Sequence, residues 1–234
     1  MNKITLVYAY YNNPQMLESQ IASWNRFEVD FDIIIVDDGS REYPLCDVKA
    51  LNDCKLNMHL YRVVPDIPWN QDGARNLAMA QASGWCYLTD IDHVIPPASA
   101  LAMANMDLSV DNYYVPMRYN FKGAQVNRHP NSYLIHRNAF WSTGGYDEDF
   151  CGWYSGDILF RSNRRHFLKE IDTDMFWTVV WHRKQIADSA TNLGRKKSEF
   201  DINNNPLFGE RVAQVPYIPQ NPIRFEWHLI SLMR

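Results

Sequence analysis

Short apolar runs separated by polar turns dominate the first hundred residues. Four of these runs predict strands, at 4–9, 32–37, 58–64 and 85–89. The run 32–37 (DIIIVD) lacks apolar–polar alternation, which is typical of a strand that is covered on both faces. The polar residues Asp38, Gly39 and Ser40 follow it and indicate a turn.

Helical periodicity lies between these runs. Leu17, Ile21 and Trp24 follow Pro14 with the spacing of one helical face. Residues 72–82 predict a second helix, which Gly84 ends. Strands that alternate with helices favour an α/β fold, with a mostly parallel sheet and helices on both faces.

The second half of the chain is less regular. Strands are predicted at 113–117, 133–136 and 177–182, and helices at 137–141 and 157–165. A loop rich in glycine and aromatic residues lies between these two helices. Beyond Ala187 the chain is polar and contains several prolines. We therefore expect one domain over residues 1–186, with halves at 1–97 and 98–186, and an extended tail over 187–234 that packs on it.

Composition narrows the function classes. The net charge of -4 and the pI near 6.0 give no general attraction for nucleic acid. None of the four cysteines forms a CxxC pair, which disfavours a structural zinc site. The apolar part of the N-terminus is shorter than a secretory signal, and no run is long enough to span a membrane. We expect a cytoplasmic protein without a transmembrane segment.

Polar segments follow three of the predicted strands, at 10–13, 37–40 and 90–93. Ligands of open α/β sheets bind beyond the carboxyl ends of the strands, so these segments should share one edge. Asp90 and Asp92 repel each other unless a cation lies between them. Oxygen ligands in this arrangement suit Mg²⁺ or Mn²⁺. By itself the pair favours a solvated acidic turn, because two aspartates at this spacing are common by chance.

An ordered series of motifs favours a cation site over a solvated turn, because the combination of motifs is more specific than any single motif. Together they resemble the motifs of GT-A fold glycosyltransferases, especially family 2, over about residues 3–182. The motifs are VDDGS (36–40), GARNLA (73–78), ASG (82–84), DID (90–92), PP (96–97) and GGYDEDF (144–150).

The resemblance implies a Rossmann-like GT-A domain and a role for each donor-binding residue. Tyr11 would lie near the nucleotide base, and Asp38 would accept a hydrogen bond from uracil. Asp37 would support the turn. Arg75 and Asp90 would face the diphosphate or the sugar. Each has a structural alternative, such as a turn cap for Asp38 or a surface helix position for Arg75.

The resemblance also implies metal ligands and a base. The metal ligands would be Asp90, Asp92 and His182, whereas His93 is expected to point away from the metal. Asp157 would be the general base, although glycine stands at 156, where the family usually has an acid. The alternative reading of Asp157 is a helix N-cap, with Asp147 and Asp149 as fallback acids.

The activity that follows is transfer of a sugar from a nucleotide-sugar, most simply a UDP-sugar, to an acceptor hydroxyl. Mn²⁺ or Mg²⁺ would assist, and the acceptor would be a carbohydrate or glycoconjugate. Asp157 as base implies inversion of the anomeric centre, whereas the departure from the family pattern at residue 156 leaves retention open. Two other classes stay open: a metal-dependent nucleotidyltransferase or phosphate hydrolase, and a non-catalytic nucleotide-sugar or carbohydrate-binding module. The sequence specifies neither the donor sugar nor the oligomeric state.

Overall fold

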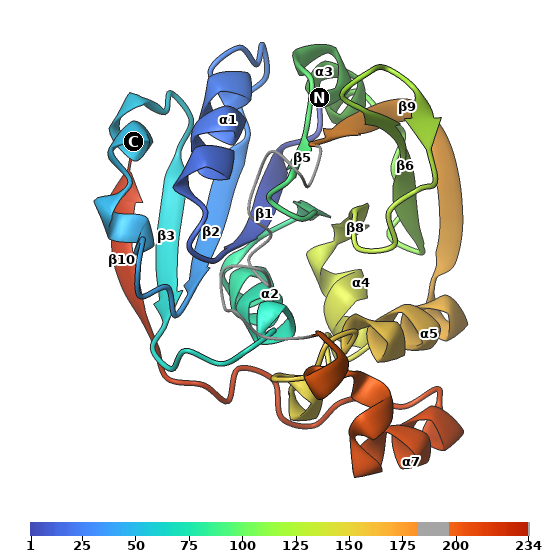
Figure 1. The fold of residues 1–234 in the computed structure, drawn as a ribbon. Helices are drawn as coiled ribbons and strands as arrows, with labels where there is room; N and C mark the ends of the chain where they lie inside the picture. The colour runs from blue at the N-terminus through green and yellow to red at the C-terminus, as the bar shows by residue number, and fades with distance from the viewer. Residues whose placement is uncertain (182–196, 234) are drawn as a thin grey trace.

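The computed structural model describes residues 1–181 and 197–233, which form one sheet with helices on both faces (Figure 1). In spatial order the strands are β10 (Trp227–Met233), β3 (Met58–Val63), β2 (Asp32–Asp38), β1 (Ile4–Tyr10), β4 (Trp85–Leu88), β8 (Tyr133–His136), β6 (Asn112–Asn120), β9 (Lys169–Val180) and β5 (His93–Val94), and the short β7 (Gln125–Val126) pairs with β6.

The centre of the sheet is parallel, as the sequence predicts. Strands β3, β2, β1 and β4 run in one direction, and β6 and β9 are also parallel neighbours. The flanks are mixed, because β8 is antiparallel to both β4 and β6. No helix of the described chain separates β6 from β8, and strands without a crossover helix between them readily pair in opposite directions.

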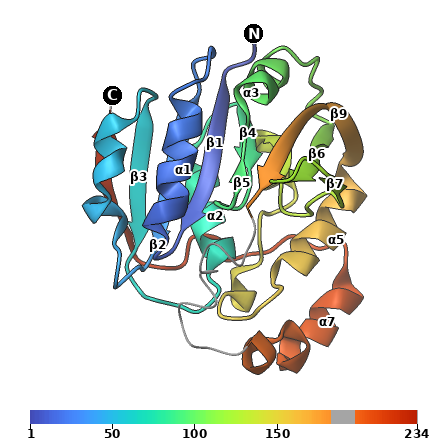
Figure 2. The ribbon, with the colours of Figure 1, turned by 45° about the horizontal axis from the view of Figure 1, so that its top comes forward.

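Two helical layers cover the sheet (Figure 2). The first contains α1 (Pro14–Trp24), α3 (Pro97–Ala104) and the 3₁₀ turns Leu45–Asp47 and Lys49–Asp53. The second contains α2 (Gln71–Gln81), α4 (Arg137–Ser142) and α5 (Asp157–Phe167). Ile33 and Ile35 of β2 pack with the first layer, whereas Ile34 and Val36 pack with the second. This alternation explains why the run 32–37 is apolar throughout.

Local sequence accounts for the ends of the first helices. Pro14 stands in the first turn of α1, and the Asn13 side chain accepts a hydrogen bond from the backbone N–H of Met16. After α2, the N–H of Ala82 donates to the carbonyl of Ala78, and Gly84 takes a positive φ of 62°. Pro14 is the first residue of α1, as the sequence suggested, and the range 72–82 predicted for the second helix lies within one residue of the bounds of α2.

The C-terminal segment contains more regular structure than an extended tail. Helix α7 (Pro206–Gln214) follows the 3₁₀ turns Lys197–Phe200 and Ile202–Asn204, and β10 adds an antiparallel edge strand to β3. The segment is joined to the domain through Glu148, in the 3₁₀ turn Glu148–Phe150. Its carboxylate accepts hydrogen bonds from the backbone N–H groups of Ile223 and Arg224, at 2.6 and 3.0 Å.

Candidate functional site

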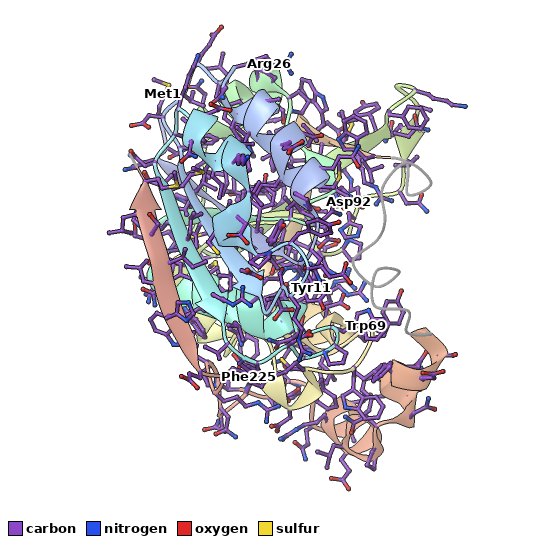
Figure 3. All side chains as sticks on the ribbon, turned by 60° about the vertical axis from the view of Figure 1, so that its left-hand side comes forward. Met1, Tyr11, Arg26, Trp69, Asp92 and Phe225 are labelled. Atoms are coloured by element: carbon purple, nitrogen blue, oxygen red, sulfur yellow. The ribbon has the colours of Figure 1, made fainter. Side chains whose placement is uncertain are left out.

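The three polar segments that follow β1, β2 and β4 meet at one edge of the sheet, as predicted. Tyr10 pairs in register with Asp37, and the N–H of Asn12 donates to Ser40 Oγ at 2.9 Å. Figure 3 shows Tyr11 and Asp92 on the side of the molecule away from Met1 and Arg26. This common edge is the candidate site.

Asp37 and Asp38 have different surroundings although they are neighbours in the chain. Asp37 is fully buried and accepts hydrogen bonds from the N–H groups of Ser40 and Leu45 and from Arg62. It therefore supports the turn, as expected. Asp38 accepts one hydrogen bond from Asn70 Nδ2, at 2.8 Å. Burial, opposed by this hydrogen bond, raises the pKa of Asp38 to about 8.

Tyr11 connects the end of β1 to the loop that follows β3, at the same edge of the sheet. Its hydroxyl donates to Asp66 Oδ1 at 3.1 Å, and Asp66 also pairs with Arg41 at 2.8 Å. Asp66 lies in the loop after β3, so the ends of three parallel strands contribute here. The half-buried Tyr11 is thus held close to this edge by a side-chain hydrogen bond.

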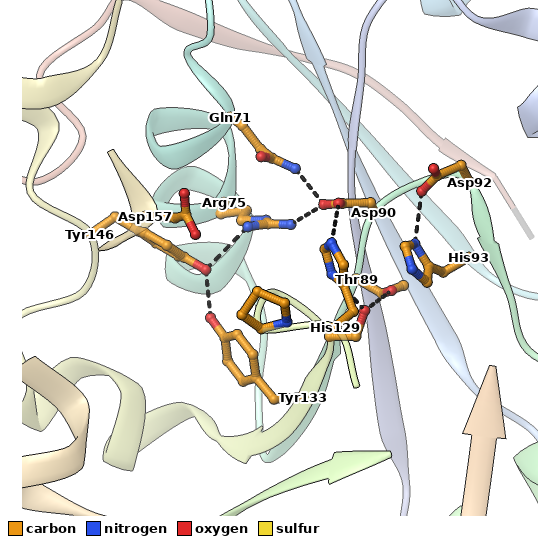
Figure 4. A network of polar contacts seen from close by, with 12 residues as sticks. Gln71, Arg75, Thr89, Asp90, Asp92, His93, His129, Tyr133, Tyr146 and Asp157 are labelled. Atoms are coloured by element: carbon orange, nitrogen blue, oxygen red, sulfur yellow. Dashed lines mark hydrogen bonds and ion pairs between the residues drawn. The ribbon is translucent and has the colours of Figure 1, made fainter. Parts of the chain in front are cut away.

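Arg75 and Asp90 form the central ion pair of the site (Figure 4). Oδ1 of Asp90 accepts hydrogen bonds from Arg75 and from Gln71 Nε2, each at 2.5 Å. Arg75 is only 1% exposed and also donates to the hydroxyl of Tyr146, at 3.2 Å. Burial disfavours ionisation of Asp90, but electrostatic attraction to His129, followed by that to Arg75, outweighs it and lowers the pKa of Asp90 to about 2.

Helix α1 holds the loop that carries Asp90 and Asp92. Nε2 of Gln20 donates to the carbonyls of Ile91 and His93, at 2.8 and 2.9 Å, and Ser23 Oγ donates to the carbonyl of Ile95 at 2.7 Å. Because Gln20 and Ser23 are buried, the acidic loop is fixed in place before any ligand binds.

His93 and His129 bring two imidazoles to Asp90. Nε2 of His129 lies 3.4 Å from Asp90 Oδ2, and the ring centroids of the two histidines are 4.5 Å apart. Ligand atoms from these three residues all lie within 4.8 Å of one another. Burial lowers the pKa of His129 to about 4, against the opposing effect of Asp90, so its imidazole is neutral at neutral pH.

The two histidines of this cluster were not among the expected ligands. His93 was expected to point away from the metal, but its ring is buried within this cluster. His129 carried no signal in the sequence, because it lies in the loop between β7 and β8 and belongs to no motif. Asp92 is turned to His93: its Oδ1 lies 2.7 Å from His93 Nδ1. His182 lies outside the described residues.

Asp157 begins α5, and its Oδ2 pairs with Arg161 Nε at 3.0 Å. Figure 4 places it on the Arg75 side of the cluster. The fallback acids are engaged elsewhere: Asp147 accepts from the Tyr217 hydroxyl at 2.8 Å, and Asp149 pairs with Arg211 at 3.0 Å. Both contacts attach the C-terminal segment.

An aromatic cluster lies near the start of α2. The Trp69 ring is 5.0 Å from the ring of Phe200 and 6.1 Å from that of Tyr154, measured between centroids. Trp69 has a positive φ of 48°, so its backbone is held in a conformation that this residue type rarely adopts. Aromatic faces of this kind are able to pack against sugar rings.

The sequence model described as Glycosyl transferase family 2 matches residues 5–172. The chain belongs to glycosyltransferase family 2. The match includes Asp38, Arg75, Asp90 and Asp157 and ends within β9, before His182. A search of curated proteins finds no match.

Solved structures of low sequence identity share the GT-A fold of this family. S. aureus TarS has a TM-score of 0.63 at 14% identity over 77% of this chain, and GalNAc-T7 with UDP, GalNAc and Mn²⁺ has 0.59 at 12% over 77%. Glucosyl-3-phosphoglycerate synthase from Mycobacterium tuberculosis, with Mn²⁺ and UDP-glucose, has 0.53 at 14% over 97% of this chain and 86% of its own. The chain spans only 37% of TarS and 44% of GalNAc-T7.

The donor atoms of the cluster suit a divalent cation. One carboxylate and two imidazoles, close enough to reach one ion, are ligands that Mn²⁺ accepts. Among the described helices, none is long and apolar enough to cross a membrane.

Proposed function

We propose that this protein transfers a sugar from a UDP-sugar to an acceptor hydroxyl with the help of a divalent cation. The Arg75–Asp90 ion pair carries the proposal, because it places a buried guanidinium and an ionised carboxylate together at the ligand-binding edge of a family 2 fold. Two structures of the same fold hold UDP or UDP-glucose together with Mn²⁺, which supports this donor class.

The nucleotide would bind over the ends of β1 and β2. Asp38 accepts one hydrogen bond from Asn70 through Oδ1, and we assign Oδ2 of its ionised carboxylate to the N3–H of uracil, a donor that favours loss of the Asp38 proton. Tyr11 would pack against the base from the neighbouring strand end. Arg75 would bind the diphosphate or the donor sugar, since a planar guanidinium matches phosphate oxygens.

The cation would bind at Asp90. The resemblance in sequence implies Asp92 and His182 as further ligands, whereas the structure brings His93 and His129 to Asp90. Trp181, the residue before His182, donates its backbone N–H to the carbonyl of Asp92 at 3.0 Å, so the end of this described segment lies beside the acidic loop. When bound, the cation supplies positive charge that stabilises the departing diphosphate.

The transfer step requires a base for the acceptor, and we assign this role to Asp157. The carboxylate takes the proton of the acceptor hydroxyl while the hydroxyl oxygen forms a bond to the anomeric carbon. The bond from that carbon to the diphosphate oxygen breaks, and UDP leaves with the electron pair. Attack from the side opposite UDP inverts the anomeric centre. The aromatic cluster of Trp69, Tyr154 and Phe200 would pack against the acceptor.

The test is UDP release from a panel of UDP-sugars, each with Mn²⁺, with Mg²⁺ or with a chelator. Release that needs both a sugar acceptor and a divalent cation supports transfer. Binding of UDP-sugar without turnover would instead identify a binding module, and pyrophosphate release from nucleoside triphosphates would identify a nucleotidyltransferase. The variant Asp107→Asn, at an exposed acid distant in sequence from every motif, is the matched control for acidic substitutions in the site.

A further inference from the structure

We propose that Asp90, His93 and His129 bind the divalent cation directly, and that Asp92 positions His93 from behind. The role of the cation in this inference rests on the proposed function. The set of metal ligands can nevertheless be tested without measuring turnover. It differs from the expectation from sequence, in which Asp92 and His182 are ligands and both His93 and His129 have no role.

The separation of Asp90 and His129 fits two ligands of one ion. Bonds of about 2.1 Å to two ligands at tetrahedral or octahedral angles separate the ligand atoms by roughly 3.0–3.4 Å. Oδ2 of Asp90 and Nε2 of His129 are 3.4 Å apart. This oxygen is the one that Arg75 and Gln71 leave available, because both of them bind Oδ1.

Asp92 sets the orientation of His93. A carboxylate only accepts, so His93 Nδ1 must carry the hydrogen that lies between it and Asp92 Oδ1, 2.7 Å away. The lone pair of His93 is then on Nε2. A carboxylate behind a histidine in this way orients the ring and increases its basicity toward a metal, and its loss typically weakens metal binding about 10–100-fold.

Arg118 competes for the same lone pair. Its guanidinium nitrogen lies 3.3 Å from His93 Nε2, where it donates a hydrogen bond. A cation bound by His93 must displace this donor and also tolerate its positive charge. Removing the guanidinium should therefore strengthen cation binding, which is an effect opposite to that of removing a ligand.

The other face of His129 is supported by the protein. Its Nδ1 lies 3.4 Å from Ser132 Oγ, and Ser132 Oγ is 2.7 Å from Thr89 Oγ1 at the end of β4. Both partners are fully buried, so the ring orientation is set before a cation binds. Two imidazoles and one carboxylate favour Mn²⁺ or Zn²⁺ over Mg²⁺ and Ca²⁺, which prefer sites made only of oxygen.

The test is direct titration of the purified protein with Mn²⁺ alone, with free Mn²⁺ followed by electron paramagnetic resonance. We expect His129→Asn and His93→Asn each to weaken binding at least about tenfold, Asp92→Asn to weaken it by about tenfold, and Arg118→Gln to tighten it. His166→Asn, at an exposed histidine of α5, is the control and should bind as the wild type does. Mg²⁺ should displace Mn²⁺ only weakly.

Wild-type Mn²⁺ affinity in both His93→Asn and His129→Asn, with loss in Asp92→Asn and His182→Asn, would overturn the ligand set and leave sugar transfer intact. The proposed function can also fail alone. If Mn²⁺ binds through Asp90, His93 and His129 but the protein releases no UDP from any UDP-sugar, only the proposed function is refuted. If His129→Asn does not fold, His129→Cys provides the second measurement, since a thiolate ligand should give a Cd²⁺ charge-transfer absorbance band. A folded Cys variant without that band would also refute the proposal.

Discussion

Oδ2 of Asp72 lies 2.7 Å from the position that a side-chain carbon would occupy at residue 156. Glycine there lets the start of α2 approach the start of α5. Asp72 is buried, and burial, followed by the charge of Asp157, raises its pKa well above the ordinary value. An acidic side chain at 156, which the resemblance to the family implies, would collide with this carboxyl group. Asp72 in its present position and an acid at 156 therefore exclude each other.

We expect Gly156→Ala to lower the free energy of unfolding by about 1–3 kcal/mol, because the added carbon overpacks the contact with Asp72. Its backbone φ of -53° suits alanine, so strain at position 156 itself does not contribute. Chemical denaturation measures the effect. Gly209→Ala, in α7 with nothing within 4 Å of the new carbon, should be neutral or stabilising. If the collision is the cause, Gly156→Ala should lower the free energy of unfolding by less in a protein that also carries Asp72→Ala.

Asp38 should make stability depend on pH. The unfolded carboxyl ionises near 3.8 and the folded one near 8. Between these pH values the unfolded chain has lost a proton that the folded protein retains, so this group lowers the free energy of unfolding as pH rises, and its effect levels off above about pH 8. We expect Asp38→Asn to become progressively more stable than the wild type from pH 4 to pH 8. A difference that stays constant over this range, as expected for the control Asp107→Asn, would contradict the raised pKa.

Glu148 should determine whether the C-terminal segment stays docked. Its carboxylate accepts two backbone N–H groups of that segment and the side-chain amide of Asn76. Glu148→Ala would leave these donors unpaired, at about 1–3 kcal/mol for each one that stays buried. We expect faster proteolysis between α7 and β10 and a lower melting temperature. Glu18→Ala, at an exposed position of α1, should change neither.

Asp157 is tested by separating its ion pair from its proposed role as base. Asp157→Asn should bind UDP-sugar with unchanged affinity and lose turnover by about 10²–10⁴-fold. Arg161→Gln breaks the same ion pair but keeps the carboxylate, so it should retain most of the turnover. Equal losses in both variants would show that the ion pair supports α5 and that the base lies elsewhere.

Arg75 should be intolerant of lysine. Its guanidinium contacts Asp90 and Tyr146 from one buried position, and a single ammonium group is unable to reproduce both hydrogen bonds. We expect Arg75→Lys to weaken binding of UDP, measured by calorimetry, and to lower stability. Arg26→Lys, two residues beyond the end of α1 and on the side of the molecule away from Tyr11 and Asp92, is the control (Figure 3).

Local sequence was sufficient to predict the parallel centre of the sheet and the edge where the site lies. The run 32–37 identified a strand buried on both faces, and the polar residues after β1, β2 and β4 could meet only at the carboxyl edge, because parallel strands end together. The order of the motifs then identified the family and drew attention to Asp38, Arg75 and Asp90.

Tertiary packing decided the partners of these residues. His129 reaches Asp90 from a loop without a motif, Glu148 holds a distant backbone segment, and Trp227–Met233 joins the sheet although its side chains are largely exposed. Periodicity in a sequence reports which face of an element is buried, but it does not report which distant loop packs against that face. The sequence by itself determined the elements and the binding edge, whereas contacts between segments far apart in the chain decided the composition of the site.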